Sequence, residues 1–403
     1  MKTFKELNNN IRRYLISLLL YYGATNLSSI FVNIYLWKAN QEVRDVAVYN
    51  LYYSVAIPLT FIVGGWIVKS IGPLPIYRVG ILSDIVFYVL LLLLKTESVH
   101  YLWLIGVLKG AGTGFWALGM HVISFDYVER EDLEVVFSYR NVFMKAAILI
   151  APLITGVVLK CLPSQRGYDV IFTCSLVLFT ASVLSTLSIR NSKRYSRYRL
   201  LSVLKNRNAD WMGIMASQGM VGIREITFSF LISLLLFIET NSELSVSGFT
   251  VVGGVVAIAS TYAVGRRINA ANRKKILVVS AAFLMLSIIG MTSDITLYSI
   301  LFYVVVSSGF EPLQSIIFNT MGFEVIKRNI RDESQQVEYI VAREIPMAIG
   351  RCLGLTAFVV SQDVLHHPAL LKGIIIAIGS AYVWMSVILC RIKEQRNLDQ
   401  VNG

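Results

Sequence analysis

Twelve apolar segments, each long enough to cross a lipid bilayer as a helix, make up most of this 403-residue sequence. The composition agrees, because 55% of the residues are hydrophobic and only 15% are charged, whereas a soluble domain carries about 25% charged residues. The sequence therefore predicts an all-α membrane protein with twelve transmembrane helices. The expected crossings are residues 13–37, 47–69, 75–94, 100–124, 136–159, 168–189, 211–238, 246–268, 275–292, 295–321, 337–360 and 369–390.

Lysine and arginine are distributed unevenly between the loops. Most of the 37 Lys and Arg residues lie at the two termini or in the loops that follow the even-numbered crossings. Because cytoplasmic loops are enriched in basic residues, we expect both termini to lie in the cytoplasm and the protein in the plasma (cell) membrane. The net charge of +12 is then a topology signal, and nucleic acid is not an expected partner. The opposite loops hold only Lys38, Arg44, Lys95, Lys160, Arg166 and Lys372.

A basic stretch divides the chain into two similar halves. We interpret residues 190–209 as a solvated cytoplasmic linker, in preference to an anionic-lipid contact, between a six-helix bundle at 1–189 and a second at 210–403. Three short motifs recur in the same order about 200 residues later, which indicates a duplicated six-helix unit. Parallel repeats around a central site are typical of transporters. The matched motifs are residues 23–30 with 219–226, 114–118 with 309–313, and 140–144 with 343–347.

Two charges lie near the middle of the crossing at 211–238. A charged residue at a helix centre costs roughly 2.5–3.5 kcal/mol on insertion scales, so Arg224 and Glu225 predict a protein-lined or water-filled interior behind this helix. Adjacent helical residues point about 100° apart, so both cannot face that interior equally. We expect Arg224 to bind an anionic group or to pair with Glu311, and Glu225 to pair with a neighbouring helix.

The twelve crossings, the duplication and the basic central linker resemble the major facilitator superfamily over essentially the whole chain. The family motif between the second and third helices is G-x-x-x-D-R-x-G-R-K, and residues 65–74 keep both of its glycines but carry Lys69 in place of the acid. In the family this loop helps to hold the cytoplasmic gate closed. Lys69 in place of the acid argues against the same contact in this chain. The helix-five motif of drug antiporters survives only as residues 151–156. The resemblance therefore favours an uncharacterised bacterial branch over a drug or sugar subgroup.

The resemblance also implies that the first, fourth, seventh and tenth helices line a central cavity. At about 1.5 Å per residue, Asn26, Trp116, Arg224 and Glu311 lie near the mid-depth of these helices. Trp116 is interpreted as part of an aromatic wall or as core packing. Lys109 and Arg351 are further candidates for the substrate or proton pathway. Arg343 is expected at the cytoplasmic boundary.

Glu311 allows two interpretations. It precedes Pro312, which can kink its helix. Burial favours the protonated acid, whereas a nearby arginine favours the carboxylate, and this competition is what a protonation switch needs. In the second interpretation, Glu311 and an arginine form a permanent ion pair that holds the halves together.

The sequence thus predicts a secondary active transporter that moves a small organic solute, zwitterionic or anionic, by alternating access. A proton is a candidate coupling ion, and the chain is expected to act as a monomer in the lipid bilayer. The alternative is a membrane sensor or scaffold that retains the fold without transport. Cysteine and histidine spacing predicts neither disulfides nor a metal site, and no phosphate-binding loop is present, so we expect no cofactor and no enzymatic activity.

Overall fold

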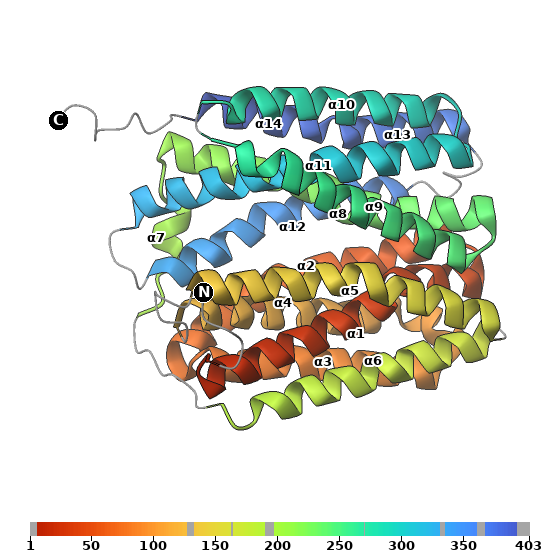
Figure 1. Ribbon diagram of the computed structural model, residues 1–403, viewed down its shortest axis with the longest axis horizontal. Helices are drawn as coiled ribbons and strands as arrows, with labels where there is room; N and C mark the ends of the chain where they lie inside the picture. Colours follow the sequence, from red (N-terminus) through yellow and green to blue (C-terminus); the bar gives the residue numbers. More distant parts are fainter. Residues whose placement is uncertain are drawn as a thin grey trace.

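The structure is a computed structural model that describes residues 6–126, 133–162, 164–189, 197–269, 271–330, 335–360 and 367–392. Long helices joined by short loops dominate these ranges (Figure 1). The first half contains α1 (Asn9–Asn40), α2 (Val43–Ile71), α3 (Pro73–Leu94), the short 3-10 helix η1 (Lys95–Tyr101), α4 (Leu102–Asp126), α5 (Leu133–Cys161) and α6 (Ser164–Thr186). The second half contains α8 (Ala209–Thr240), α9 (Glu243–Ala263), η2 (Gly265–Arg267), α10 (Arg273–Ser293), α11 (Leu297–Asn329), α12 (Gln336–Val360), α13 (Pro368–Gly379) and α14 (Ala381–Arg391).

The helices account for twelve crossings in the described part of the chain. Ten helical segments there are long and apolar enough to span a membrane by length and composition, and one of them, Pro73–Ser124, contains both α3 and α4. The charged helix α12 is not among the ten, because it carries Glu338, Arg343, Glu344 and Arg351. Counting α3, α4 and α12 separately, and α13 with α14 as one crossing interrupted at Ser380, confirms the predicted all-α twelve-helix fold.

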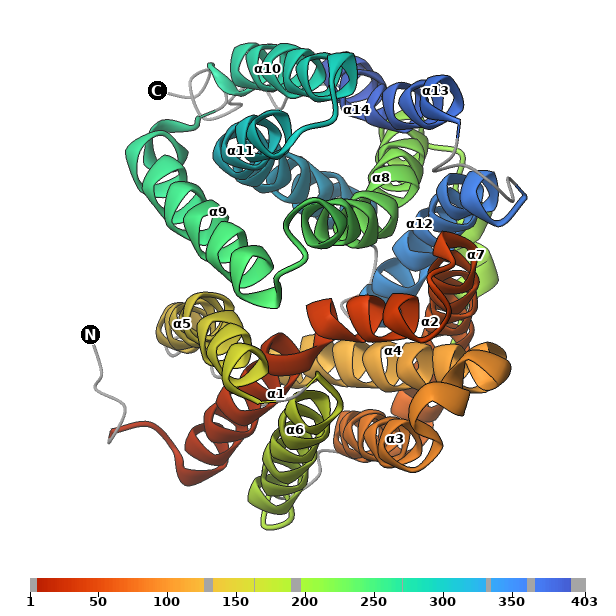
Figure 2. The same ribbon diagram turned by 90° about the vertical axis from the view of Figure 1, so that its right-hand side faces the viewer.

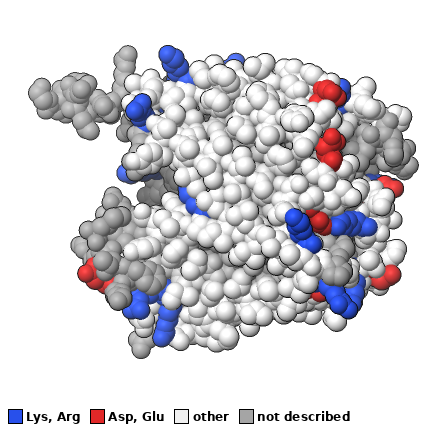
Figure 3. Space-filling model, turned by 45° about the vertical axis from the view of Figure 1, so that its right-hand side comes forward, with Lys and Arg blue, Asp and Glu red and all other residues white. Residues whose placement is uncertain are grey.

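The helices run roughly along the long axis of the molecule, so its two ends correspond to the two sides of a membrane (Figure 1). We call the end where α1 begins and α14 finishes the termini end, and the other the distal end. The short helix α7 (Leu200–Leu204) lies at the termini end. Most charged side chains visible in Figure 3 lie toward the ends, with an apolar band between them. Large apolar side chains such as Leu93 and Trp66 are exposed, as expected of a lipid-facing surface.

The two halves meet through a few helix pairs. Helix α2 packs along α12, α5 packs along α9, and α1 touches α8. Figure 2, which looks along the helices, shows α1–α6 on one side of this seam and α8–α14 on the other. Within the first half, Gly106 and Gly110 of α4 face the backbone carbonyl oxygens of Tyr49 and Tyr53 of α2. A Cβ at these glycines would lie 2.7 and 2.5 Å from those oxygens, so the small residues are what allow the helices to approach.

Candidate functional site in the membrane interior

Two adjacent cavities lie between the halves and share Glu225 of α8 as a lining residue. The central cavity has a volume of about 700 Å³, and α8, α9 and α11 form most of its wall, with Ile30 and Ile148 contributed by the first half. The tyrosine cavity has a volume of about 350 Å³ and lies against α1, α2 and α4, where Tyr21 and Tyr53 line it. Both halves therefore contribute to each cavity.

Arg224 of α8 and Glu311 of α11 form an ion pair on the wall of the central cavity. Tyr382 of α14 completes the cluster: its hydroxyl accepts a hydrogen bond from Arg224 Nη1 at 3.1 Å and donates to Glu311 Oε1 at 3.0 Å. The guanidinium carbon of Arg224 also lies 4.1 Å from the centroid of the Tyr382 ring. The Arg224 side chain is 7% exposed and that of Glu311 is 40% exposed, so the carboxylate is the part that the cavity can reach.

This geometry revises one of the two interpretations of Glu311. The expected pairing with Arg224 is present, but α8 and α11 belong to the same half of the molecule. The pair cannot hold the halves together, because both of its members belong to the second half. Pro312 lies inside α11, which is assigned as one helix from Leu297 to Asn329.

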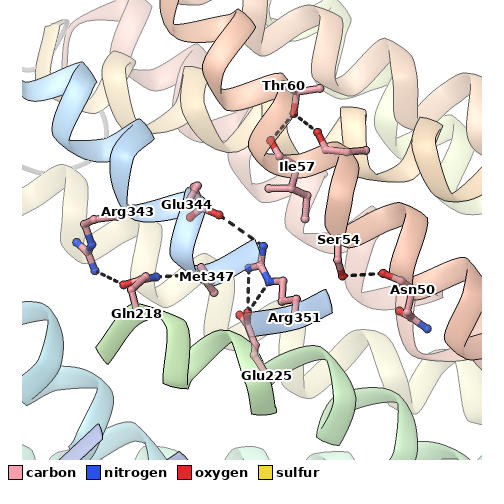
Figure 4. A network of polar contacts seen from close by, with 11 residues as sticks. Asn50, Ser54, Ile57, Thr60, Gln218, Glu225, Arg343, Glu344, Met347 and Arg351 are labelled. Atoms are coloured by element: carbon pink, nitrogen blue, oxygen red, sulfur yellow. Dashed lines mark hydrogen bonds and ion pairs between the residues drawn. The ribbon is translucent and has the colours of Figure 1, made fainter. Parts of the chain in front are cut away.

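Arg351 of α12 connects a second group of charges (Figure 4). Its Nη2 and Nε donate to Glu225 Oε2 at 2.9 and 3.2 Å, and its Nη1 lies 3.5 Å from Glu344 Oε2. The predicted pairing of Glu225 with a neighbouring helix is therefore present. Glu225 and Arg351 also line the tyrosine cavity, so this pair lies where α8 and α12 meet the first half.

A third cavity, of about 200 Å³, lies nearer the termini end between α8, α11 and α12. We call it the Arg343 cavity, and Gln218 and Asn319 are among its lining residues. Arg343 Nη2 donates to Gln218 Oε1 at 3.2 Å and to Asn319 Oδ1 at 3.3 Å, as Figure 4 shows for Gln218. Its guanidinium carbon lies 5.4 Å from the centroid of the Phe318 ring.

The first half has its own buried ion pair, between Asp84 of α3 and Lys109 of α4. Lys109 Nζ lies 2.7 Å from Asp84 Oδ1, and the hydroxyl of Tyr21 donates to Asp84 Oδ2 at 3.0 Å. The Lys109 ammonium also lies within 5.5–5.7 Å of the ring centroids of Phe87, Tyr88 and Phe179. Trp116 stacks on Tyr21, with ring centroids 3.8 Å apart, so its ring is part of the packing around this pair.

The predicted pathway residues fall into three groups. Arg224 and Glu311 line the central cavity, whereas Lys109, Trp116 and Arg351 line the tyrosine cavity. Asn26 lines none of the three cavities, and its amide donates to the carbonyl of Tyr22 at 2.8 Å on its own helix. The polar residues that α1 presents to the tyrosine cavity include Thr25, Ser29 and Asn33, and Asn33 accepts a hydrogen bond from Asn50 at 3.0 Å.

Several residues of these clusters were not predicted as site residues, among them Tyr382, Gln218, Asn319 and Arg343. Tyr382 lies in an apolar segment, where a tyrosine carries no sequence signal that separates it from the other tyrosines of the chain. Gln218 was not singled out, although an amide inside a crossing is a detectable signal. Arg343 was expected at the cytoplasmic boundary, but it lies within α12 on the wall of its own cavity.

Comparison with known proteins identifies the family. The sequence profile of the Major Facilitator Superfamily matches residues 14–333. A protein of Bacillus subtilis (strain 168), described as "Uncharacterized protein YqgE", is 31% identical over 374 residues, which cover 92% of this chain and 87% of that protein. A Geobacillus stearothermophilus protein described as "Uncharacterized protein in sodM 3'region" is 37% identical over 147 residues, covering 36% of this chain and 69% of that protein.

Solved structures show the same fold at low sequence identity. The human organic anion transporter MFSD10 (TETRAN) superposes with a TM-score of 0.64 at 12% identity, covering 96% of this chain and all of that one. A bacterial homologue of the iron transporter ferroportin, in an inward-facing state, gives 0.71 at 13% identity, covering 95% and 98%. A bacterial metal transporter gives 0.65 at 16% identity, covering 96% and 99%. Together with the sequence match, the helical architecture establishes that this chain belongs to the Major Facilitator Superfamily and is a multi-pass membrane protein of that transporter family.

Proposed function

We propose that the protein is a secondary active transporter that moves a small anionic or zwitterionic organic solute by alternating access. The observation that carries this proposal is the Arg224–Glu311–Tyr382 cluster on the wall of the central cavity. A buried cation and a partly exposed carboxylate can bind the two charges of a zwitterion, or exchange a proton for an anionic group. An ion pair that served packing alone would have no need of a carboxylate open to a cavity.

The moving parts in this proposal are the two halves, residues 1–189 and 210–403, joined by 190–209. The central and the tyrosine cavity each have walls from both halves, so rocking one half against the other would change which end of the molecule these two cavities open toward. Helix pairs α2–α12 and α5–α9 are the contacts across which this movement would occur. Because basic residues are concentrated at the termini end, this proposal assigns that end to the cytoplasm and the protein to the plasma membrane.

The solute panel for testing transport follows from the cavity and the neighbours. Carboxylates, phosphate esters and amino acids match the charges of the central cavity, and one structural neighbour is an organic anion transporter. Divalent metal ions are included because two other neighbours are related to metal transport. Within the described residues, no group of three or more His, Cys, Asp or Glu side chains gathers in a metal-binding arrangement.

The test is solute flux and solute-driven proton movement in proteoliposomes, with wild type and Glu311→Gln. We expect a solute to drive proton movement in wild type, and we expect this movement to fall to background in Glu311→Gln, because the amide cannot take up a proton. Tyr382→Phe keeps the ion pair but removes the hydroxyl, so we expect slower flux with proton coupling retained. Glu324→Gln is the matched control, because Glu324 lies on the same helix but pairs with Arg273 outside the three cavities.

The other outcomes distinguish the alternatives. Solute flux that survives Glu311→Gln unchanged and moves no protons would leave Glu311 structural and favour a uniporter. If the folded protein neither transports nor binds any solute of the panel, the result would favour the sensor or scaffold.

A further inference from the structure

Arg343 differs from the other cations of the membrane interior in its partners. Arg224, Arg351 and Lys109 each lie within 4 Å of a carboxylate oxygen. Arg343 forms no such ion pair within the described residues, and its two hydrogen-bond acceptors, Gln218 and Asn319, are neutral amides. The next residue, Glu344, is already within reach of Arg351. The Arg343 guanidinium therefore lies within electrostatic range of Glu344 but forms no ion pair of its own among the described residues.

The Arg343 guanidinium is also incompletely satisfied. Its Nε is buried and has no hydrogen-bond partner, although burial of an unpaired polar group is costly. The two amides hold the guanidinium through their oxygens, which leaves N–H groups to donate. Asn319 Nδ2 donates to Ser315 Oγ at 3.3 Å, and each amide nitrogen carries two donors. The cluster is thus rich in donors and short of an acceptor.

Basic side chains of the first half lie near Arg343, although they do not line its cavity. His121 of α4 lies within electrostatic range of both Arg343 and Arg140 of α5. Arg140 forms no ion pair in the part of the chain that the structure describes, and its guanidinium carbon lies 5.4 Å from the Phe137 ring centroid. Basic side chains from both halves therefore converge on the termini side of the molecule.

The Arg343 cavity continues the path from the central cavity toward the termini end. The two cavities share Arg224, Glu225 and Ser315 as lining residues. Asn319 lies eight positions beyond Glu311 on α11, which corresponds to about 12 Å along the helix axis. Arg343 precedes Arg351 on α12 by the same number of positions. A solute that leaves the Arg224–Glu311 pair in this direction meets Arg343 next.

We propose that Arg343, Gln218 and Asn319 form an anion-binding subsite that takes a carboxylate or phosphate group of the carried solute. This inference rests on the proposed transport function and narrows its substrate class to small organic anions. The planar guanidinium matches the two oxygens of such a group, and the amide N–H groups supply further donors. Gln218 is positioned for this role by a second contact, from its Nε2 to the sulfur of Met347 at 2.9 Å.

The experiment measures anion binding rather than transport. Purified full-length protein in phosphatidylcholine nanodiscs is titrated with inorganic phosphate, succinate and benzoate, and with choline as the cationic comparison, while thermal unfolding is followed. We expect the three anions to raise the unfolding temperature of the wild type and choline to leave it unchanged. In Arg343→Gln the anion dissociation constants should rise about tenfold or more, because hydrogen bonds to an ionised group are among the strongest in proteins.

Asn319→Asp tests the same site without removing the arginine. The new carboxylate would replace an amide oxygen that already lies 3.3 Å from Arg343, so it should fold and compete with the anion for the guanidinium. Arg273→Gln is the matched control, because Arg273 is a buried arginine of the same half that lines none of the three cavities. Unchanged anion affinity in both Arg343→Gln and Asn319→Asp, or an equal loss in Arg273→Gln, would overturn the subsite.

Two further comparisons separate the sources of the anion and the two proposals. Repeating the titration in nanodiscs with phosphatidylglycerol should leave the affinities unchanged, and weaker phosphate binding there would assign the site to a lipid headgroup and overturn the solute proposal. Arg343-dependent anion binding without flux in proteoliposomes would reject the transport function but keep the anion subsite. Anion flux in proteoliposomes that neither Arg343→Gln nor Asn319→Asp alters would support the transport function and overturn the anion subsite.

Discussion

At the scale of single residues, the Asp84–Lys109 pair invites a quantitative test, because these side chains are only 0% and 7% exposed. Breaking a buried pair by removing one partner costs about 3–5 kcal/mol, since the other charge is left uncompensated. We therefore expect Asp84→Asn to destabilise the protein by an amount in this range, measured as the free energy of unfolding in detergent. The double substitution Asp84→Asn with Lys109→Met should recover most of the loss.

Glu324→Gln provides the comparison for this prediction. Glu324 pairs with Arg273 at 2.9 Å, but its side chain is one-third exposed, so its loss should cost about 1 kcal/mol or less. Equal effects of Asp84→Asn and Glu324→Gln would contradict a role for the buried pair in holding α3 to α4.

Charged residues inside apolar segments were also the site residues that could be predicted most clearly from the sequence. The pairing of Arg224 with Glu311, and of Glu225 with another helix, followed from the cost of leaving such charges in lipid. Tyr382 did not follow, because a tyrosine in an apolar segment is compatible with lipid, core or cavity. Its place beside Glu311 depends on how α14 packs against α8, which no local pattern records.

At the scale of elements, α8 and α12 approach so closely that glycine is required between them. A Cβ added at Gly350 would overlap the carbonyl oxygen of Gly219, and one at Gly354 would overlap that of Ile223. We expect Gly350→Ala to cost about 1–3 kcal/mol in unfolding free energy, because the helices must separate to admit the methyl group. The separation should also lengthen the Glu225–Arg351 contact, which bridges the same two helices.

A glycine with free space around it supplies the control for Gly350→Ala. No atom lies within 4 Å of a Cβ added at Gly248 of α9, so Gly248→Ala should be neutral or stabilising by up to about 1 kcal/mol through helix propensity. Thermal unfolding of the two alanine variants in the same detergent compares them directly. Similar losses in both would mean that propensity and membrane insertion, rather than helix contact, govern these positions.

Hydropathy predicted the helices well because each crossing must be apolar over its whole length. It also predicted α12 as a crossing despite its four charges, since the apolar residues between them still reach the required length. The break at Ser380 within the last crossing was not predicted, because residues 373–390 form one uncharged and mainly apolar run. Which helices face one another depends on tertiary packing, so the position of Arg343 inside a cavity was missed.

At the scale of the whole molecule, an ion pair between described residues joins the halves at each end. At the distal end, Lys38 of α1 pairs with Glu243 of α9, and Tyr168 of α6 donates to Glu243 at 3.2 Å. At the termini end, Lys69 of α2 lies 3.3 Å from Glu338 of α12. The first half provides the cation in both pairs. Lys69, which stands where the family motif has an acid, therefore contributes a positive charge to a contact with the other half.

In the proposed alternating-access cycle, the contacts at one end break as that end opens, so the two pairs should bias the protein in opposite directions. The Lys69–Glu338 side chains are 6% and 1% exposed, against 29% and 14% for Lys38–Glu243, and the more buried pair should have the larger effect. We expect Glu338→Gln to favour opening at the termini end and Glu243→Gln to favour opening at the distal end. A change of about 1–2 kcal/mol would shift either equilibrium by a factor of about 5–30.

A single cysteine at Ser229, which lines both the central and the tyrosine cavity, can report these shifts in a variant whose four native cysteines are replaced by serine. Membrane-impermeant maleimide, applied separately to each side of sealed vesicles, then measures access from each end. Glu338→Gln should raise the labelling rate from the termini side and lower it from the distal side, and Glu243→Gln should do the opposite. Exchanging the charges, with Lys69→Glu and Glu338→Lys together, should restore the wild-type ratio, because the exchanged pair makes the same contact. Shifts in the same direction for both single variants would show that the pairs contribute only general stability and do not control which end opens.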